Sequence, residues 1–261
     1  MSAGARSLAD LRAPEIADRL SPSSVLLQPV GAIEQHGPHL PLSTDLLIAD
    51  ALAAAVVAAR GDELDLWLLP PLAYTKSNEH AWAPGTIWLS PQTMLSVLDD
   101  LGRSLATLPA KKLVFLNGHG GNTALLTVAN RELRLAHGLM TFLMHPSQPR
   151  DSGGAADVHD DELGMGVHAG RDETSVVLHL RPELVDMSVA ERSIPNAFAG
   201  NARVRFGGDV AFGWAADDLS ATGAIGDPTL ASAELGATLW AGMIASAAEA
   251  LAEIAAFAFE R

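Results

Sequence analysis

The chain has 261 residues, of which 48% are hydrophobic, enough to bury a sizeable core and too many for a disordered protein. The 17 basic and 31 acidic residues give a net charge of -14, so we expect no nucleic-acid partner, because such a surface repels phosphate. Since there is no cysteine, disulfides and cysteine-built zinc sites are excluded, and any metal must be held by histidine and carboxylate.

Neither end of the sequence predicts a membrane segment. Residues 1–20 carry charges throughout and lack the apolar stretch of a signal peptide. The apolar run 238–259 is alanine-rich and interrupted by Glu249 and Glu253, which favours a buried amphipathic helix over a membrane span. Because no basic amphipathic stretch is present either, we expect a cytoplasmic protein without a membrane partner.

Apolar runs of strand length alternate with longer segments of helical period. In chain order, the pattern predicts a strand at 24–30, a helix at 46–60, a strand at 64–69, a helix at 91–108 capped by Ser90, a strand at 112–116, a helix at about 123–137, a strand at 139–144, and a C-terminal helix beginning near Thr229 behind an Asp227-Pro228 cap.

This alternation predicts an α/β fold with a mainly parallel sheet and helices on both faces. No linker or repeat divides the chain, so we interpret residues 1–261 as a single domain and the gap 153–170 as an active-site loop. In such folds, ligands bind beyond the carboxyl ends of the strands. Functional residues should therefore come directly after strands.

The first group of reactive side chains follows the strand at 24–30 and contains Glu34, His36, His39 and Asp45. If the chain is still extended there, Glu34 and His36 project to the same side. Taken singly, Asp45 could be only a helix N-cap and His39 a structural loop histidine. Taken together, Glu, His and Asp in a chain without cysteine favour a site for Zn²⁺, Mn²⁺ or Fe²⁺.

The second group, Asn117-Gly-His-Gly-Gly-Asn122, follows the strand at 112–116. A glycine-rich turn before a helix suggests a phosphate cradle, but Thr123 stands where a dinucleotide fingerprint needs glycine, and the lysine of a P-loop is missing. The glycines more plausibly bring the backbone and His119 close to a bound group. We therefore favour His119 as a ligand over a structural histidine.

The third group surrounds His168 and Glu173 at the start of a helical segment. Acidic residues at a helix N-terminus favour the macrodipole, which accounts for Glu173 but leaves His168 to be explained. We interpret His168 as a general acid/base. A weaker block contains Glu79 and His80, for which structural and functional interpretations are equally good, and Trp88 could line a pocket, although apolar core is the safer assignment for it.

Five segments in this order resemble the creatininase (creatinine amidohydrolase) family: GAIEQHGPHLPLSTD at 31–45, EHAWAPGTI at 79–87, NGHGGN at 117–122, HAGRDETS at 168–175 and TGAIGDPTLAS at 222–232. The resemblance covers most of the chain. It implies an α/β fold with a mainly parallel sheet, hydrolysis of amide C–N bonds, and assembly as a homohexamer.

The resemblance also implies two divalent metal ions in each subunit. Carried onto this sequence, Glu34, Asp45 and His119 match the ligands of one ion. His36, Asp45 and Glu173 match those of the second, so that Asp45 bridges the two. His168 matches the catalytic histidine of the family.

Two departures separate this chain from creatininase itself. Creatininase carries an aromatic residue and then a glutamate after the motif histidine, where this chain has Gly120 and Gly121. It also closes a tryptophan over creatinine from the loop before His-Ala-Gly, and no aromatic residue lies between His145 and His168. Relatives with the plainer motif include formamide deformylases and the peptidase of mycofactocin maturation. The two departures speak against creatinine itself, and the resemblance implies a small cyclic amide, a formamide or a short peptide as the substrate.

The expected chemistry is amide hydrolysis by a hydroxide that the metal site activates, because coordination can lower the pKa of water from about 15.7 towards 7. His168 would protonate the leaving nitrogen, while Asn117, Asn122 and Thr174 would hold the ligands in place from behind. No G-x-S-x-G nucleophile motif occurs. Two alternatives stay open: a single-metal hydrolase with Glu173 as base, and a non-catalytic metal-binding relative.

Overall fold

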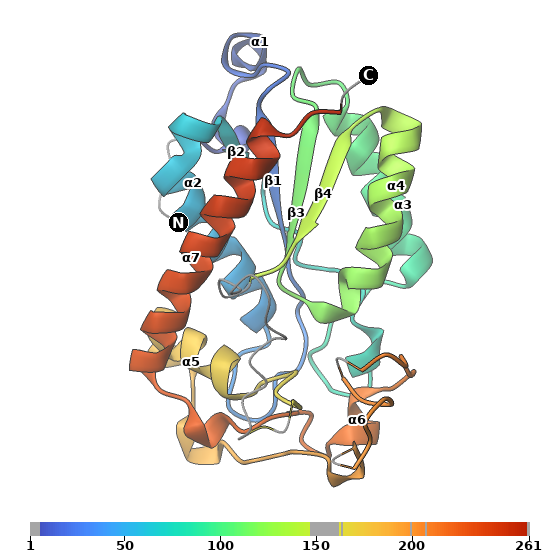
Figure 1. Ribbon diagram of the computed structural model, residues 1–261, viewed down its shortest axis with the longest axis vertical. Helices are drawn as coiled ribbons and strands as arrows, with labels where there is room; N and C mark the ends of the chain where they lie inside the picture. Colours follow the sequence, from blue (N-terminus) through green and yellow to red (C-terminus); the bar gives the residue numbers. More distant parts are fainter. Residues whose placement is uncertain (1–5, 147–161, 163, 199, 207, 260–261) are drawn as a thin grey trace.

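The computed structural model describes residues 6–146, 162, 164–198, 200–206 and 208–259. Within these residues, the strands β1 (Val25–Val30), β2 (Leu66–Leu68), β3 (Lys112–Asn117) and β4 (Met140–Met144) form a four-stranded parallel sheet in the order β2-β1-β3-β4 (Figure 1). In the register, Val25 pairs with Leu66 on one side and with Lys112 on the other. The predicted parallel sheet is confirmed.

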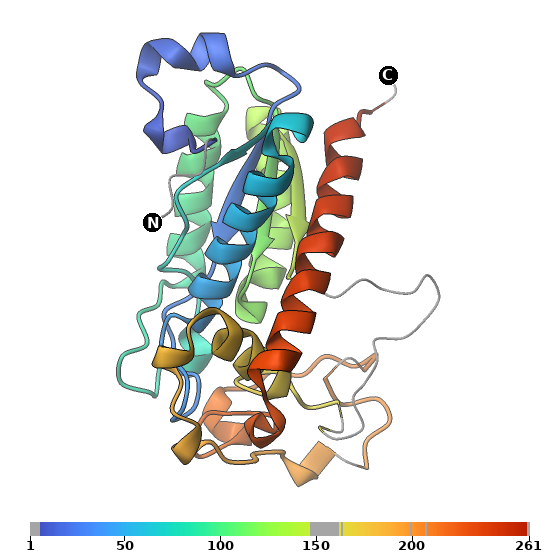
Figure 2. The ribbon, with the colours of Figure 1, turned by 90° about the vertical axis from the view of Figure 1, so that its left-hand side faces the viewer.

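Helices cover both faces of this sheet, as predicted. The α-helices are α1 (Ile16–Arg19), α2 (Thr44–Leu64), α3 (Pro91–Leu105), α4 (Thr123–His137), α5 (Arg171–Leu180), α6 (Ala216–Leu219) and α7 (Ala233–Ala256). The 3-10 turns are η1 (Leu8–Asp10), η2 (Ala13–Glu15), η3 (Asn78–His80), η4 (Gly120–Asn122), η6 (Pro182–Leu184), η7 (Met187–Val189), η8 (Asn196–Phe198) and η9 (Pro228–Leu230). Figure 2 shows the layers: α2 and α7 lie on one face of the sheet, and α3 and α4 lie on the other.

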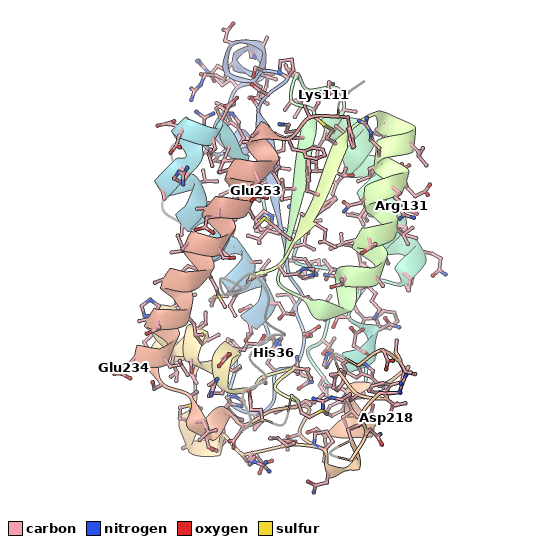
Figure 3. All side chains as sticks on the ribbon, viewed as in Figure 1. His36, Lys111, Arg131, Asp218, Glu234 and Glu253 are labelled. Atoms are coloured by element: carbon pink, nitrogen blue, oxygen red, sulfur yellow. The ribbon has the colours of Figure 1, made fainter. Side chains whose placement is uncertain are left out.

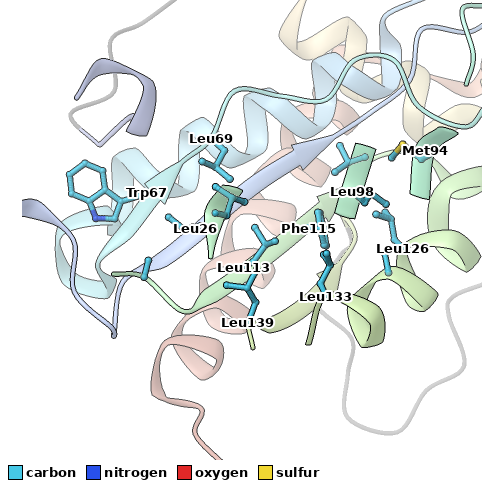
Figure 4. Packing of buried hydrophobic residues seen from close by; sticks show 14 of the residues in the cluster. Leu26, Trp67, Leu69, Met94, Leu98, Leu113, Phe115, Leu126, Leu133 and Leu139 are labelled. Atoms are coloured by element: carbon cyan, nitrogen blue, oxygen red, sulfur yellow. The ribbon is translucent and has the colours of Figure 1, made fainter. Parts of the chain in front are cut away.

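The two faces of the sheet belong to two separate apolar clusters because successive side chains of a strand point to opposite sides. On β3, Leu113 and Phe115 join the cluster beneath α3 and α4, which Figure 4 shows from close by. Val114 and Leu116 join the cluster beneath α2 and α7. A strand that is buried on both faces needs a continuous apolar run, which is what residues 113–116 supply.

The carboxyl ends of the parallel strands all lie at one end of the sheet, and the segments with the reactive groups begin there. β1 leads into the segment with Glu34 and His36, and β3 leads into His119. In Figure 3, His36 lies in the middle of the molecule beyond these strand ends, whereas Lys111 lies at the opposite end of the sheet. The arrangement follows the rule for open α/β sheets.

Several predicted boundaries in the first half of the chain are wrong. The helix predicted at 46–60 runs from Thr44 to Leu64. Leu64 was expected to open a strand, but it ends α2, and Asp65 closes that helix with a φ of 51° in the left-handed region that aspartate tolerates. The helix predicted at 91–108 ends at Leu105, because a tight turn follows in which the N–H of Leu108 donates to the carbonyl of Leu105.

Two expected caps are also corrected. Asp45 is the second residue of α2, and the N-cap position belongs to Ser43. Near the C-terminus, the Asp227 side chain accepts the N–H of Thr229 and caps only the short turn η9. The long helix α7 begins after Ser232, whose hydroxyl accepts the N–H of Leu235. In the predicted loop 153–170, residues 153–161 and 163 lie outside the described residues.

Helix α7 is long and apolar enough, by length and composition, to cross a membrane, and a core helix of a soluble protein meets the same criteria. One side of it packs on α2 and α5, and Ala247 and Leu251 are buried in the apolar cluster between the sheet and the helices α2 and α7. Although only 11% of its most apolar window is buried, its large apolar side chains Trp240, Met243 and Ile244 pack against the sheet, as expected of an amphipathic helix that is buried on one side.

Candidate metal centre

The three groups of reactive side chains meet at the carboxyl ends of β1 and β3. Glu34 and His36 come from the segment after β1, Asp45 from the first turn of α2, His119 from the segment after β3, His168 from the segment before α5, and Glu173 from α5 itself. All are buried except Glu173, whose side chain is 25% exposed. Two triads lie with their ligand atoms within 4.8 Å of one another: Glu34, Asp45 and His119, and His36, Asp45 and Glu173.

Asp45 is shared between the two triads, and its two oxygens face different histidines. Oδ1 lies 3.2 Å from Nε2 of His36, and Oδ2 lies 3.1 Å from Nδ1 of His119. A carboxylate in this orientation could serve two cations at once.

When Nδ1 of His119 carries no proton, as in a metal-binding ring, two buried acceptors at this point have no hydrogen bond among the described residues. They are Oε1 of Glu34 and Oδ2 of Asp45, and both face Nδ1 of His119 at 3.3 Å and 3.1 Å. An unsatisfied buried carboxylate oxygen is costly unless a cation compensates it. The donor set of imidazole and carboxylate, with no thiolate, suits Zn²⁺, Mn²⁺ or Fe²⁺.

Backbone carbonyls fix the orientation of each histidine ring. Nδ1 of His36 lies 3.1 Å from the carbonyl of Glu34, Nε2 of His119 lies 3.0 Å from that of Lys76, and Nε2 of His168 lies 2.7 Å from that of Gln35. Because a carbonyl only accepts, each of these ring nitrogens carries the proton. The opposite nitrogen of each ring is then free to face the carboxylates, which is how metal-binding histidines are usually oriented.

His168 differs from the other two histidines in its surroundings. Its ring lies between those of His36 and His80, with centroids 4.2 Å and 4.4 Å away, and its Nδ1 lies 3.8 Å from Oε1 of Glu34. Burial and the neighbouring charge of His36 lower the pKa of His168 to about 3, so the ring is neutral. Glu34, His36 and His168 also form a third triad that could hold an ion.

The carboxylates and histidines shift one another's pKa values. Burial alone would lower the pKa of His36, but Asp45 and Glu173 outweigh it and raise that pKa to about 10. His119 follows the same logic, with Glu34 and Asp45 holding its pKa well above the usual value against the effect of burial. Burial raises the pKa of Glu173 to about 7 against the opposing charge of His36. The centre therefore retains protons at neutral pH that a cation would have to displace.

Glu173 is held in place by a strained residue. Ala169 has a φ of 52°, in the left-handed region that β-carbon residues avoid, and its N–H donates to Oε2 of Glu173 at 2.6 Å. This leaves Oε1 of Glu173 to face Nε2 of His36 at 3.8 Å.

Asn117 and Asn122, both predicted to support the site, hold the segment that carries His119. Nδ2 of Asn117 donates to the carbonyl of His119 at 2.7 Å. Asn122 donates to Thr75 at 3.1 Å and accepts the N–H of Lys76 at 3.2 Å, so it ties the η3 loop to the end of β3. The two asparagines thus fix His119 and the carbonyl behind it as one unit.

Glu79 and His80, from the weaker block, also reach the centre. Oε1 of Glu79 lies 3.4 Å from Nε2 of His119, and its other oxygen pairs with Lys76 at 2.6 Å. Burial would raise the pKa of Glu79, but His119 and Lys76 lower it to about 2. A Cβ at Gly121 would overlap the Glu79 carboxylate, so glycine is required where that carboxylate meets His119.

The remaining predicted residues lie further out. Nε2 of His39 and the hydroxyl of Thr174 are 3.0 Å apart, and this pair joins the segment after β1 to α5 without entering the two triads. Trp88 is 44% exposed and forms an isolated bridge with Thr75. It belongs neither to the described lining of the cavity beside the centre nor to the apolar core, which corrects both expectations for it.

Sequence reasoning missed two residues that contact the centre directly. The Gln35 amide nitrogen lies 2.7 Å from Nδ1 of His80 and 3.2 Å from Nε2 of His168. Ser77 donates its hydroxyl to Oε2 of Glu34. Gln35 stands between Glu34 and His36 in the sequence, and that position was the only available signal.

A cavity of about 270 Å³ opens beside the centre. His168 and Glu173 form part of its wall, Ile48 and Val176 give it an apolar side, and His145 lies on its lining as an exposed histidine. The size suits one small group next to the reacting bond.

Comparison with known proteins places the chain in a family. A family model described as creatininase, creatinine amidohydrolase, matches residues 9–251. The chain belongs to the creatininase family. The family assignment and the α/β fold expected from the sequence motifs are confirmed, and the chain is a creatininase-family amidohydrolase.

Two curated relatives illustrate the range of this family. The chain is 39% identical over 226 residues to the mycofactocin precursor peptide peptidase of Mycobacterium ulcerans (strain Agy99), covering 84% of this chain and 81% of the relative. It is 33% identical over 178 residues to the creatinine amidohydrolase of Pseudomonas putida, covering 62% and 66%.

Solved structures of creatininase share the fold. A mutant creatininase is 27% identical with a TM-score of 0.73, covering 95% of this chain and 98% of that one. Another mutant creatininase, of Zn-Zn type, has a TM-score of 0.70 at 27% identity over 94% of this chain and 96% of that one, and a manganese creatininase has 0.68 at 27% over 94% and 97%.

Proposed function

We propose that this protein is a metal-dependent amidohydrolase with two divalent ions in one site and an amide bond of a short peptide as its substrate. One observation carries the proposal: Asp45 turns one oxygen to His36 and the other to His119, in the middle of two buried triads. The similarity to a Zn-Zn and to a manganese creatininase supports metal dependence, with Fe²⁺ as a third option from the donor set.

The proposed ligands divide into two sets. Glu34, Asp45 and His119 would hold one ion, and His36, Asp45 and Glu173 the other. The buried acceptors without hydrogen bonds, Oε1 of Glu34 and Oδ2 of Asp45, support this assignment. When bound, the ions would supply a water of lowered pKa and a Lewis acid for the substrate carbonyl.

A side chain of the protein, that of His168, would transfer the proton during hydrolysis. The Nε2–H of neutral His168 donates to the Gln35 carbonyl, so Nδ1 is the basic atom on the side of Glu34. We infer that Nδ1 takes a proton from the attacking water and delivers it to the departing nitrogen. His80 holds the ring by stacking, and the Gln35 carbonyl holds it by accepting from Nε2 at 2.7 Å.

Glu173 offers a rival mechanism for the same hydrolysis. Its pKa of about 7 is suited to a general base, as in a one-ion hydrolase. In that case Glu173 would leave the ligand set, and the protein would bind one ion per chain. The number of bound ions separates the two mechanisms.

The peptide substrate is supported by the 39% identity to a mycofactocin precursor peptide peptidase and by the glycines that replace the aromatic residue and glutamate of creatininase itself. The cavity of about 270 Å³ suits one amino-acid side chain beside the scissile bond. The test is a screen of Zn²⁺- and Mn²⁺-loaded protein with short peptides, formamides and lactams including creatinine, measured by released amine. Turnover of peptides supports the proposal, whereas turnover of creatinine or a formamide alone contradicts it.

We further propose a cytoplasmic homohexamer. The resemblance to the creatininase family suggests the assembly.

A further inference from the structure

Glu162 is a buried carboxylate outside the two triads, beside the N-terminus of α5. Its Oε1 accepts the N–H of Arg171 at 3.0 Å and the N–H of Asp227 at 2.6 Å. Gly170 occupies the N-cap position of α5 and has no side chain to cap the helix. Glu162 therefore caps α5 from outside the helix, where a negative charge also favours the macrodipole.

Three glycines make room for this carboxylate. A Cβ at Gly166 would overlap Oε2 of Glu162, and a Cβ at Gly170 or Gly226 would lie 2.7 Å from Oε1. Since real Cβ atoms do not come that close, no other residue fits at these positions while Glu162 stays where it is. The backbone at all three glycines therefore lies close to the Glu162 carboxylate.

The two segments that Glu162 ties together also pair with each other. The N–H of Ile225 donates to the carbonyl of His168 at 2.7 Å, and the N–H of His168 donates to the carbonyl of Ile225 at 3.2 Å. One segment thus carries His168 and leads into α5 with Glu173, and the other runs from Ile225 to Asp227. Glu162 links the two segments at a second place, through its hydrogen bonds to the N–H groups of Arg171 and Asp227.

We propose that Glu162 is a positioning residue that holds the start of α5, and with it Glu173 and His168, against the rest of the centre. The proposal rests on the two-ion function given above. Without Glu162, the first turn of α5 loses its acceptor and its tie to Asp227, so Glu173 leaves its place beside His36. The ion assigned to His36, Asp45 and Glu173 is weakened, whereas the ion assigned to Glu34, Asp45 and His119 stays.

The first test replaces Glu162 and counts ions. Zn²⁺ is added to the metal-free full-length protein, and ions per chain and both affinities are measured by elemental analysis and chelator competition. We expect Glu162→Ala to retain one ion, and Glu162→Gln, which keeps one acceptor oxygen, to bind one of the two ions roughly 10- to 100-fold more weakly. Two ions bound with wild-type affinity in folded Glu162→Gln would overturn the proposal.

The matched control is Asp65→Asn. Asp65 accepts hydrogen bonds from Arg6, Ser24 and Trp67 at the other end of the sheet. Its loss should lower the melting temperature and leave both ions in place. If Asp65→Asn loses an ion as readily as Glu162→Gln does, general destabilisation explains the effect, and the proposal is wrong.

A second pair of variants displaces Glu162 without removing it. In Gly166→Ala the new methyl group would overlap Oε2 of Glu162, whereas a methyl group at Gly213 meets no atom of the described residues within 4 Å. We expect Gly166→Ala to weaken one ion, as Glu162→Gln does, and Gly213→Ala to behave as wild type. If Gly166→Ala binds both ions with wild-type affinity, the position of the Glu162 carboxylate does not matter for ion binding, and the proposal is wrong.

Hydrogen exchange of the metal-free protein separates this proposal from the proposed function. Glu162→Gln should speed the exchange of amides in 168–173 and 225–227, and Asp65→Asn should not. If wild-type protein binds fewer than two ions, the two-ion function fails while faster exchange still supports the tie made by Glu162. Unchanged exchange in both segments overturns the tie itself.

Discussion

The carbonyl behind each histidine decides which ring nitrogen faces the centre. His36 presents Nε2, whereas His119 and His168 present Nδ1. These carbonyls belong to Glu34, Lys76 and Gln35, which lie in the segment after β1 and in the η3 loop. A substitution that moves one of these loops should therefore reorient a histidine ring, even though the substituted residue is not itself a predicted metal ligand.

Replacing His168 tests its role as the acid/base. We expect His168→Ala to lower kcat by about 10²–10⁴-fold while two ions remain bound, because the ring supplies a proton site and no ligand in the proposed assignment. Turnover and ions per chain are measured on the same preparation. His137→Ala, at the end of α4, is the control and should behave as wild type.

Two outcomes would contradict this assignment of His168. Retained turnover in folded, loaded His168→Ala would leave the ring a structural role. Loss of an ion would move His168 into the ligand set, in the third triad with Glu34 and His36.

Metal binding should release protons. In the metal-free protein, the pKa of His36 is about 10 and that of His119 is well above its usual value, so both rings are protonated at neutral pH. Because a metal needs neutral rings and an ionised Glu173, whose pKa is about 7, we expect between about two and three protons per chain to appear on addition of Zn²⁺ in a weakly buffered solution at neutral pH. For the same reason, apparent affinity should rise with pH up to about pH 10, the pKa of His36. Binding with no proton release and no pH dependence would show that these rings are not ligands.

At the scale of elements, periodicity predicted the interior of each strand and helix better than its ends. The helix at 123–137 was predicted with both ends right, because Gly138 follows it with a positive φ of 72°. The errors at Leu64 and near Thr229 come from side chains that stop or start a helix locally: Asp65 in the left-handed region, and Asp227 capping only a short turn. Local chemistry of this kind competes with the apolar pattern and is not visible in it.

The candidate site likewise contains residues that the sequence predicted and residues that it did not. Residues directly after a strand, such as Glu34 and His119, were predicted because the fold class dictates where strands end. Gln35, Ser77 and Glu162 were not, because each reaches the centre or its support through a loop whose path depends on tertiary contacts. A sequence pattern cannot tell which loop residue turns inward.

The corrected start of α7 is itself testable. Ser232 accepts the N–H of Leu235 and so caps the helix. Replacing an N-cap serine by alanine leaves that donor unsatisfied, so Ser232→Ala should lower the free energy of unfolding by about 0.5–2 kcal/mol in a urea titration. Ser96→Ala, at an exposed position of α3, should change it little. Equal effects of the two substitutions would place the start of α7 elsewhere.

For the whole molecule, the packing of α7 belongs to the fold, and the oligomeric state is a separate question. Helix α7 packs one side on α2 and α5, and its exposed side carries small and charged residues such as Ala241 and Glu249. We expect light scattering to give about six times the chain mass of 27.3 kDa, as the proposed homohexamer requires. A mass of 27.3 kDa at working concentration would show a monomer and refute the assembly.

The central claim is that two ions shared through Asp45 carry the hydrolysis. Its most direct test is a titration of metal-free protein with Mn²⁺ or Zn²⁺, in which ions bound and peptide hydrolysed are followed together in the wild type and in Asp45→Asn. Asp50→Asn, on the same helix, is the matched control. The account predicts that hydrolysis rises as the second ion binds, and that Asp45→Asn alone loses both the ions and the activity. Full hydrolysis at one ion per chain, or two ions still bound by Asp45→Asn, would contradict it.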